Sequence, residues 1–226
     1  MSPESGAARS TDHGARVERC RLYLITPPAL EPAAFAGVLA DALDGGDVAC
    51  VQLRLDTADD AALRAAADAL APLCRERDVA FLVSGRADIA AQAGADGVHL
   101  GNAAAIPEAR RLLGADSIAG VSCGGSRHAG MRAAEAGADS VSFGAFHPAT
   151  TKPDAALVSP DVLSWWSGLM AAPCVAVGGI TAANGAALVA AGANFLAVSG
   201  AVWRGSGGPA RAVAALNATI ESARPS

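Results

Sequence analysis

The sequence predicts an α/β fold, a (β/α)8 TIM barrel, from two observations. Eight short apolar runs alternate with alanine-rich segments of helical spacing. The runs are almost continuously apolar, as is typical of parallel strands covered on both faces. In addition, Ala-Gly-Ala-Asp/Asn motifs at 93–96, 136–139 and 191–194 each precede a run. Such a motif is typical of a helix that ends on a left-handed glycine before the next strand.

The apolar runs give the order of the elements. The predicted strands are 22–25, 48–53, 79–83, 97–100, 118–122, 140–143, 174–177 and 195–198. The clearest helices between and after them are 33–43, 61–74, 106–113, 129–136, 160–169 and 209–220. An open doubly wound sheet is the alternative, but its Gly-x-Gly-x-x-Gly signature is absent after the first strand. We therefore expect one barrel domain over residues 20–226, preceded by a disordered polar tail over residues 1–19.

Local signals mark several boundaries. Thr57-Ala-Asp-Asp60 has the form of a capping box for the helix 61–74, and Asp88 opens the following helix. We expect Asp56, Asp59, Asp60 and Asp88 to be helix-start acids and not catalysts. His99 lies inside the fourth strand, where we expect a core histidine with satisfied hydrogen bonds. His128 falls in the first turn of the helix after strand five, where we expect a surface or capping role.

Composition excludes several classes of function. The chain is 52% hydrophobic and 17% charged, with a formal net charge of −5, so no positive field attracts nucleic acid or an anionic membrane. Residues 162–203 carry no charge, but glycines and Pro173 interrupt them, which argues against a membrane span. Five widely spaced cysteines without a Cys-x-x-Cys pair indicate free thiols in a reducing cytoplasm.

Glycines follow the last two predicted strands. Strand seven is followed by Gly178-Gly179-Ile180-Thr181 and strand eight by Ser199-Gly200-Ala201. In TIM barrels these two loops commonly bind phosphate, and glycine lets backbone N–H groups approach an anion closely. The alternative is that the glycines only make tight turns. We expect a phosphate site here.

Polar side chains follow other strands. Gln52 and Arg54 alternate onto one side of strand two, and an arginine in the barrel mouth needs an anionic partner. That partner is either an anionic substrate or an internal carboxylate. Ser122 ends strand five and can donate to a phosphate, whereas the adjacent Cys123 is expected to be inert. The long loop 144–158 contains Thr151 and Lys152, which either bind an anionic leaving group or are solvated; His147 has no role from spacing alone.

Five segments together resemble a known family. "VQLR", "GADGVHLG", "GADSVSFGAFHPATTK", "CVAVGGI" and "LAVSGAVW" are similar to the strand ends of thiamine phosphate synthase and its relative, thiazole tautomerase. The resemblance covers residues 21–220 in order. Synthases of this family join a pyrimidine methyl pyrophosphate to a thiazole phosphate: pyrophosphate leaves first, and the thiazole nitrogen captures the pyrimidine cation.

The resemblance implies a set of substrate-binding residues. Gln52 and Arg54 would contact the pyrimidine and its pyrophosphate. Ser122 and Lys152 would hold pyrophosphate, with Thr151 beside them, so Arg54, Ser122 and Lys152 are the candidate catalytic residues. The remaining substrate-binding candidates are Ser84, Asn102, Gly179, Ser199 and Gly200, of which the last three would hold the thiazole phosphate.

The sequence departs from the family pattern at the magnesium site that the resemblance implies. Ser84-Gly85 stands where the family has Asn-Asp, and Asn102-Ala103-Ala104 stands where it has Gln-x-Asp. Gly85 and Ala104 thus replace the two acids expected to bind Mg²⁺, a cation that protein carboxylates hold. Stabilisation of the leaving group would then depend on Arg54, Arg86 and Lys152.

Further departures separate the alternatives. Ala149 replaces a threonine, Asp56 lies near the place of a lysine, and Gly124 replaces the histidine with which the tautomerase transfers protons. The leading hypothesis is a thiamine phosphate synthase-type transferase, with impaired activity left open. The alternatives are a non-catalytic barrel that binds a thiazole or pyrimidine phosphate, and a tautomerase-type isomerase in which His128 or His147 substitutes. All three imply small phosphorylated ligands without nucleic acid or membrane, and a homodimer is left open.

Overall fold

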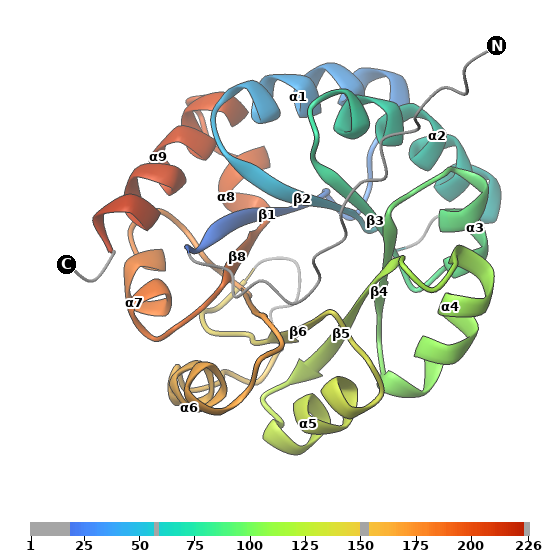
Figure 1. The fold of residues 1–226 in the computed structure, drawn as a ribbon. Helices are drawn as coiled ribbons and strands as arrows, with labels where there is room; N and C mark the ends of the chain where they lie inside the picture. The colour runs from blue at the N-terminus through green and yellow to red at the C-terminus, as the bar shows by residue number, and fades with distance from the viewer. Residues whose placement is uncertain (1–18, 57–58, 150–153, 224–226) are drawn as a thin grey trace, which may run out of the picture.

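Eight parallel strands close into a barrel in chain order. The computed structural model describes residues 19–56, 59–149 and 154–223. Each strand pairs with its neighbours in sequence, and the last pairs with the first. The end-on view in Figure 1 shows this ring. The predicted TIM barrel is confirmed, while the expected tail of residues 1–19 lies outside the described residues except for Arg19.

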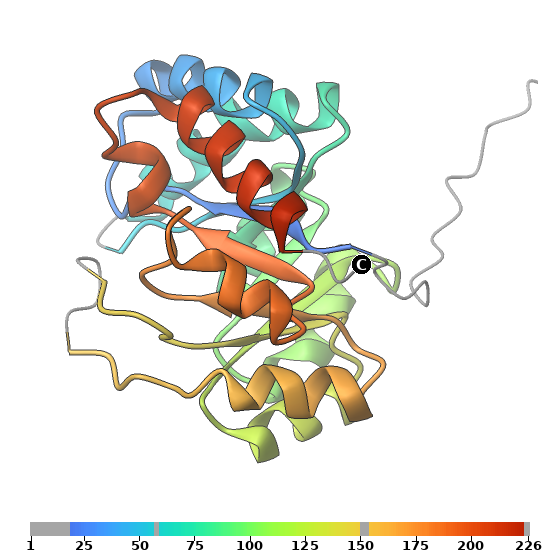
Figure 2. The ribbon, with the colours of Figure 1, turned by 90° about the vertical axis from the view of Figure 1, so that its left-hand side faces the viewer.

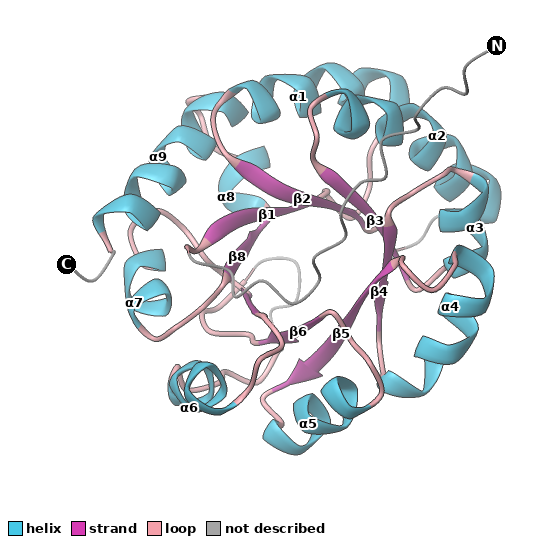
Figure 3. Cartoon of the chain, in the orientation of Figure 1, coloured by secondary structure: helices cyan, strands magenta, loops and turns pink. Residues whose placement is uncertain are grey.

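Strands and helices alternate around the ring. The strands are β1 Arg21–Ile25, β2 Val48–Leu53, β3 Ala80–Ser84, β4 Gly97–Leu100, β5 Ile118–Gly124, β6 Ser140–Phe143, β7 Cys174–Val177 and β8 Phe195–Val198. The helices are α1 Pro32–Asp44, α2 Asp60–Glu76, α3 Ala87–Gln92, α4 Ile106–Leu113, α5 Arg127–Glu135, α6 Asp161–Leu169, α7 Gly185–Ala190, α8 Gly200–Trp203 and α9 Pro209–Ser222, with a 3-10 turn, η1 Ala103–Ala105, before α4. Figure 3 shows the helices outside the strands.

Among the boundaries that differ from the predicted ones, two have a clear local reason. Helix α2 is capped by Asp59, whose carboxylate accepts from the backbone N–H of Ala62 at 2.8 Å, so its cap lies two residues beyond the predicted Thr57. Strand β3 begins one residue late, because the N–H of Val79 still donates to the carbonyl of Cys74 at the end of α2. The interpretation as a helix-start acid is confirmed for Asp59 but is wrong for Asp56, which lies before the cap and pairs with Arg54 instead.

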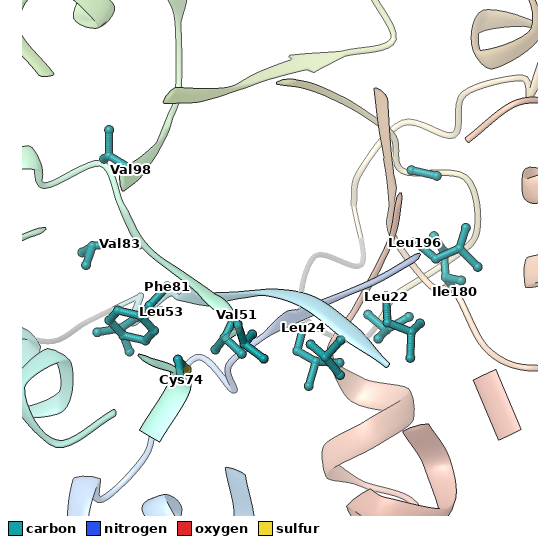
Figure 4. Close-up of a cluster of buried hydrophobic side chains, with 14 of the residues drawn as sticks. Leu22, Leu24, Val51, Leu53, Cys74, Phe81, Val83, Val98, Ile180 and Leu196 are labelled. Atoms are coloured by element: carbon teal, nitrogen blue, oxygen red, sulfur yellow. The ribbon is translucent and has the colours of Figure 1, made fainter. Parts of the chain in front are cut away.

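Alternate residues of β1, β2, β3, β7 and β8 pack into two separate apolar layers. Leu22, Leu24, Val51 and Leu53 belong to the larger layer, between the strands and the helices. Figure 4 shows these side chains on the outer side of the strands. A smaller cluster fills the barrel interior; it consists of Tyr23, Ile25, Cys50, Leu82, Val175 and Ala197. This alternation covers both faces of the sheet with apolar groups.

The C-terminal helix completes the outer ring. Helix α9 contacts α1, and Figure 2 shows the red α9 lying beside the blue α1. The Nδ2 of Asn217 on α9 donates to the carbonyl of Asp47, just before β2, at 3.2 Å. This contact joins the C-terminal helix to the segment that leads into β2. Across the described ranges, no helix has the length and apolar character needed to cross a bilayer.

Gly130 on α5 packs against an aromatic pair in the outer layer. A Cβ at this position would lie 2.6 Å from the Trp166 ring and 3.0 Å from the Phe143 ring. Both rings are fully buried and pack edge-to-face at 5.3 Å, so neither has room to move.

We therefore predict that Gly130→Ala lowers the free energy of unfolding by about 1–3 kcal/mol, through overpacking that outweighs the better helix propensity of alanine. Gly37 is the matched control, because it is helical and its Cβ would meet nothing within 4 Å. Gly37→Ala should stabilise the protein by up to about 1 kcal/mol. Urea unfolding of both variants measures the difference, and equal stability of the two would contradict the packing argument.

Candidate active site

A cavity of about 530 Å³ opens at the carboxyl ends of the strands. Its volume lies within the range of roughly 300–1,000 Å³ usual for small-molecule sites. The lining residues are Tyr23, Ile25, Gln52, Arg54, Ser84, Gly85, His99, Leu100, Gly101, Ser122, Gly124, Ser142, Gly144, Ala145, Ala149, Ala155, Val175, Val177, Gly178 and Ala197. This is the end of the barrel at which TIM-barrel enzymes carry their active sites.

The cavity wall is polar on one side and apolar on the other. Strands β2 to β6 each contribute one polar side chain to the cavity wall. These side chains, called here the polar arc, are Gln52, Ser84, His99, Ser122 and Ser142. The opposite wall is formed by Val175, Val177, Ala197 and Ile25. A ligand with one hydrogen-bonding edge and one apolar face fits this division.

Gln52 is held in one orientation by its neighbours. Its side chain is buried, its Oε1 accepts from the Tyr23 hydroxyl at 2.9 Å, and its Nε2 donates to Ser84 Oγ at 2.5 Å. Burial raises the pKa of Tyr23 well above its usual value, so the phenol stays protonated and remains a donor. The Gln52 amide carries a second N–H that these two hydrogen bonds do not use.

His99 contacts two serines of the polar arc. Its Nε2 lies 2.9 Å from Ser122 Oγ and 3.4 Å from Ser142 Oγ. Burial lowers the pKa of His99 to about 4, so the imidazole is neutral at neutral pH. The expected hydrogen-bonded histidine is confirmed, but the sequence reasoning missed its position in the cavity. The signal was available, since His99 lies on strand β4 and alternation places it on the inward face.

Arg54 lies at the mouth with an incompletely satisfied guanidinium group. Its backbone is fixed by Thr26, whose Oγ accepts from the Arg54 N–H at 3.0 Å and donates to the Arg54 carbonyl at 3.2 Å. Its Nε lies 3.2 Å from an oxygen of Asp56, yet Nε and Nη2 are both buried and form no hydrogen bond with any residue that the structure describes. Asp56 therefore supplies charge at poor hydrogen-bond geometry, and two donors remain for an anion.

The loops after β7 and β8 are tied to their surroundings. Asn184 accepts from the Thr181 N–H at 2.8 Å and donates to the Gly179 carbonyl at 3.0 Å. The hydroxyl of Ser199 donates to the Thr26 carbonyl at 3.3 Å. Gly178 lines the cavity, whereas Gly179, Ser199 and Gly200 lie beside it without lining it.

Other sequence-predicted residues do not line the cavity. Asn102 is exposed before the turn η1, and His128 is exposed on α5. Thr151 and Lys152 lie outside the described residues. Arg86, expected to face the leaving group, instead forms ion pairs with Asp60 and Asp88. Both acids begin helices, as predicted, and they hold the Arg86 guanidinium away from the cavity.

Cys123 has the properties of an inert thiol. It lies on the outer side of β5, and its sulfur is 3.6 Å from the carbonyl of Val121. Burial raises the pKa of Cys123 to about 11, which keeps the thiol protonated. Cys123 therefore takes no part in the site.

The donor set of the cavity does not fit a hard divalent cation. Among the described residues that line the cavity, there is no aspartate or glutamate. Within the described residues, no group of three or more His, Cys, Asp or Glu side chains could hold a metal ion. Because Mg²⁺ is bound in proteins through carboxylates together with phosphate oxygens, the cavity wall lacks the protein ligands that this ion needs.

Comparison with known proteins places the chain in a family. The family described as "Thiamine monophosphate synthase" matches residues 22–202. The chain belongs to this family. Thiamine-phosphate synthase of Rhodospirillum centenum is 56% identical over 199 residues, which cover 88% of this chain and 96% of the relative. Thiamine-phosphate synthase of Hyphomonas neptunium is 46% identical over 218 residues, with 94% and 99% covered.

A solved structure of the thiamine monophosphate synthase family has the same architecture. Thiamine phosphate pyrophosphorylase from Pyrococcus furiosus superimposes with a TM-score of 0.80 at 28% sequence identity, covering 92% of this chain and 99% of that one. The family resemblance read from the five strand-end segments is thus confirmed.

The neutral, half-buried His99 predicts how the stability of the protein depends on pH. Its folded-state pKa of about 4 lies below the usual 6.5, so the unfolded chain takes up the proton first as the pH falls. The protein therefore loses stability from about pH 6.5 down to about pH 4, and by about pH 5 the loss reaches about 2 kcal/mol. In His99→Gln, the decrease in unfolding free energy between about pH 7 and pH 5 should be smaller by that amount.

Urea unfolding of both proteins at the two pH values tests this prediction. His128→Gln is the control, because the exposed His128 side chain meets solvent in the folded and unfolded chain alike, and it should keep the wild-type decrease. An unchanged decrease in His99→Gln would mean that the folded protein accepts the proton at His99 already at pH 5.

Proposed function

We propose that the chain is a thiamine-phosphate synthase that joins a pyrimidine methyl pyrophosphate to a thiazole phosphate. The observation that carries the proposal is Arg54, which offers two buried, unbonded guanidinium nitrogens at the cavity mouth. An arginine in this state is suited to a phosphorylated ligand. Identity to curated synthases over nearly the whole barrel supports the same reaction.

The reaction requires that the site bind the departing pyrophosphate and exclude water from the cavity. The bond between the pyrimidine methylene carbon and the pyrophosphate oxygen breaks, and the electron pair leaves with pyrophosphate. The thiazole nitrogen then donates its lone pair to the methylene carbon. In our proposal, Arg54 and Ser122 bind the departing pyrophosphate, and Lys152 and Thr151 complete its surroundings. Electrostatic stabilisation of this kind usually supplies a large part of catalysis.

The polar arc would orient the pyrimidine. Tyr23 and Ser84 hold the amide of Gln52, which leaves one amide N–H for the ring. Neutral His99 positions the Ser122 hydroxyl without adding positive charge where the pyrimidine cation forms. The apolar wall with Val175 and Val177 would exclude water that could otherwise capture the cation. Backbone groups at Gly179, Ser199 and Gly200, and the exposed Asn102 at the rim, would contact the thiazole phosphate side.

The isomerase alternative loses the histidines on which it depended. It required His128 or His147 to replace the histidine absent at Gly124. His128 is exposed on α5, and His147 is not among the cavity-lining residues. Gly124 does line the cavity and brings no side chain for proton transfer. The binding-barrel alternative differs from the synthase only in lacking turnover, so a direct assay separates these two.

We predict that the purified protein forms thiamine phosphate from the two substrates in the presence of Mg²⁺, measured by chromatography. Arg54→Gln and Ser122→Ala should each lower kcat/KM by at least about tenfold, because each removes a hydrogen bond to a charged group worth about 1.5–3 kcal/mol. Arg132→Gln is the control, since Arg132 is exposed on α5 away from the cavity, and its kcat/KM should not change.

Absence of product at high enzyme concentration would refute the synthase proposal. Calorimetric binding of thiazole phosphate in that case would favour the non-catalytic barrel.

A further inference from the structure

The carboxylates around the cavity mouth are either engaged by arginines or away from the wall. Asp56 lies against Arg54, and Asp60 and Asp88 both pair with Arg86. Asp154, the remaining described acid of the β6 loop, is exposed and does not line the cavity. A cation held by any of the three paired acids would first have to displace a guanidinium group. Among these described acids, there is therefore no unpaired carboxylate on the cavity wall that could bind a metal ion.

Glycines occupy the cavity wall at the ends of two adjacent strands. Gly85 follows β3 and Gly101 follows β4, and both line the cavity. A Cβ built at either glycine meets nothing within 4 Å. The wall therefore has room for a side chain at both places but presents only backbone. Gly85 has φ +69°, a left-handed conformation that aspartate and asparagine tolerate better than most residues.

Arg54 is the described cation positioned to neutralise an anion in this space. Among the described residues that line the cavity, Arg54 is the only lysine or arginine. Its backbone is fixed by the two hydrogen bonds with Thr26, so the guanidinium starts from a defined position. A guanidinium can bind two phosphate oxygens at once through parallel N–H donors, which a point charge cannot do.

Resting on the proposed function, we propose that this chain binds the pyrophosphate group of its substrate directly through Arg54, without a divalent cation held by its own side chains. The cavity then recognises the metal-free anion. Any Mg²⁺ that accompanies the substrate is held by phosphate oxygens and water.

Calorimetric titration of the full-length protein with inorganic pyrophosphate tests the proposal, once in EDTA and once in excess Mg²⁺. We expect the wild-type Kd in EDTA to lie within about tenfold of the Kd in Mg²⁺. Arg54→Gln should weaken binding in EDTA by at least about tenfold, the loss expected for a charge-assisted pair. Wild-type binding that requires Mg²⁺, or no binding in either buffer, would overturn the proposal.

A pair of variants at one position sharpens the result. Gly85→Asp places a carboxylate in the space beside the cavity, and Gly85→Asn places the same shape there without charge. In EDTA, Gly85→Asp should bind pyrophosphate at least about tenfold more weakly than Gly85→Asn, and Mg²⁺ should remove the difference. Circular dichroism of both variants checks folding. Equal binding of the two variants in EDTA would show that this wall does not face the anion.

The titration and the product assay fail independently. Binding of pyrophosphate in EDTA without formation of thiamine phosphate would remove the proposed function and keep this inference. Product formation together with strictly Mg²⁺-dependent pyrophosphate binding would support the proposed function and overturn this inference.

Discussion

The pairing of β1 with β8 is the constraint on which the rest of the structure depends. Residues Arg21 to Leu24 pair with Phe195 to Val198, while the other edge of β1 pairs with β2. Closure removes both free edges of the sheet. In every strand, residues that face the barrel interior then alternate with residues that face the helices. It also brings all eight carboxyl ends to one mouth. Thr26, directly after β1, bonds to Arg54 after β2 and accepts from Ser199 after β8, so the closure reaches the site itself.

The barrel interior must satisfy the polar groups that alternation places there. A buried polar group without a partner costs free energy, and the polar arc meets this requirement through internal pairs. Tyr23, Gln52 and Ser84 form one such chain, and His99 with its two serines forms another. Arg54 departs from this rule, because Asp56 compensates its charge but leaves two nitrogens unbonded. The unsatisfied position coincides with the cavity mouth, which is why it indicates a ligand.

Local patterns in the sequence predicted the framework well, and contacts between distant segments explain what they missed. Continuous apolar runs located all eight strands, and alternation placed Gln52 and Arg54 together on the inner face. The same alternation would have placed His99 in the cavity. Arg86 could not be placed this way, because Asp60 on a different helix helps to hold it, and no local pattern reports that ion pair. The engagement of the Ser199 hydroxyl by Thr26 likewise joins residues 173 positions apart.

Direct recognition by arginine has a different cost from recognition through a bound cation. A metal site requires carboxylates whose mutual repulsion persists until the ion arrives, whereas Arg54 rests against Asp56 and keeps the local charge balanced. When a pyrophosphate enters, it competes with one partly exposed carboxylate at poor geometry, which is a small loss in a solvent-screened position. In exchange it gains a guanidinium whose backbone is already fixed. The glycines at 85 and 101 bring no charge to the adjoining wall, so these two positions add no repulsion toward the anion. In the proposed mode of binding, a family member with this wall would hold its leaving group by charge and hydrogen bonds supplied by the polypeptide alone.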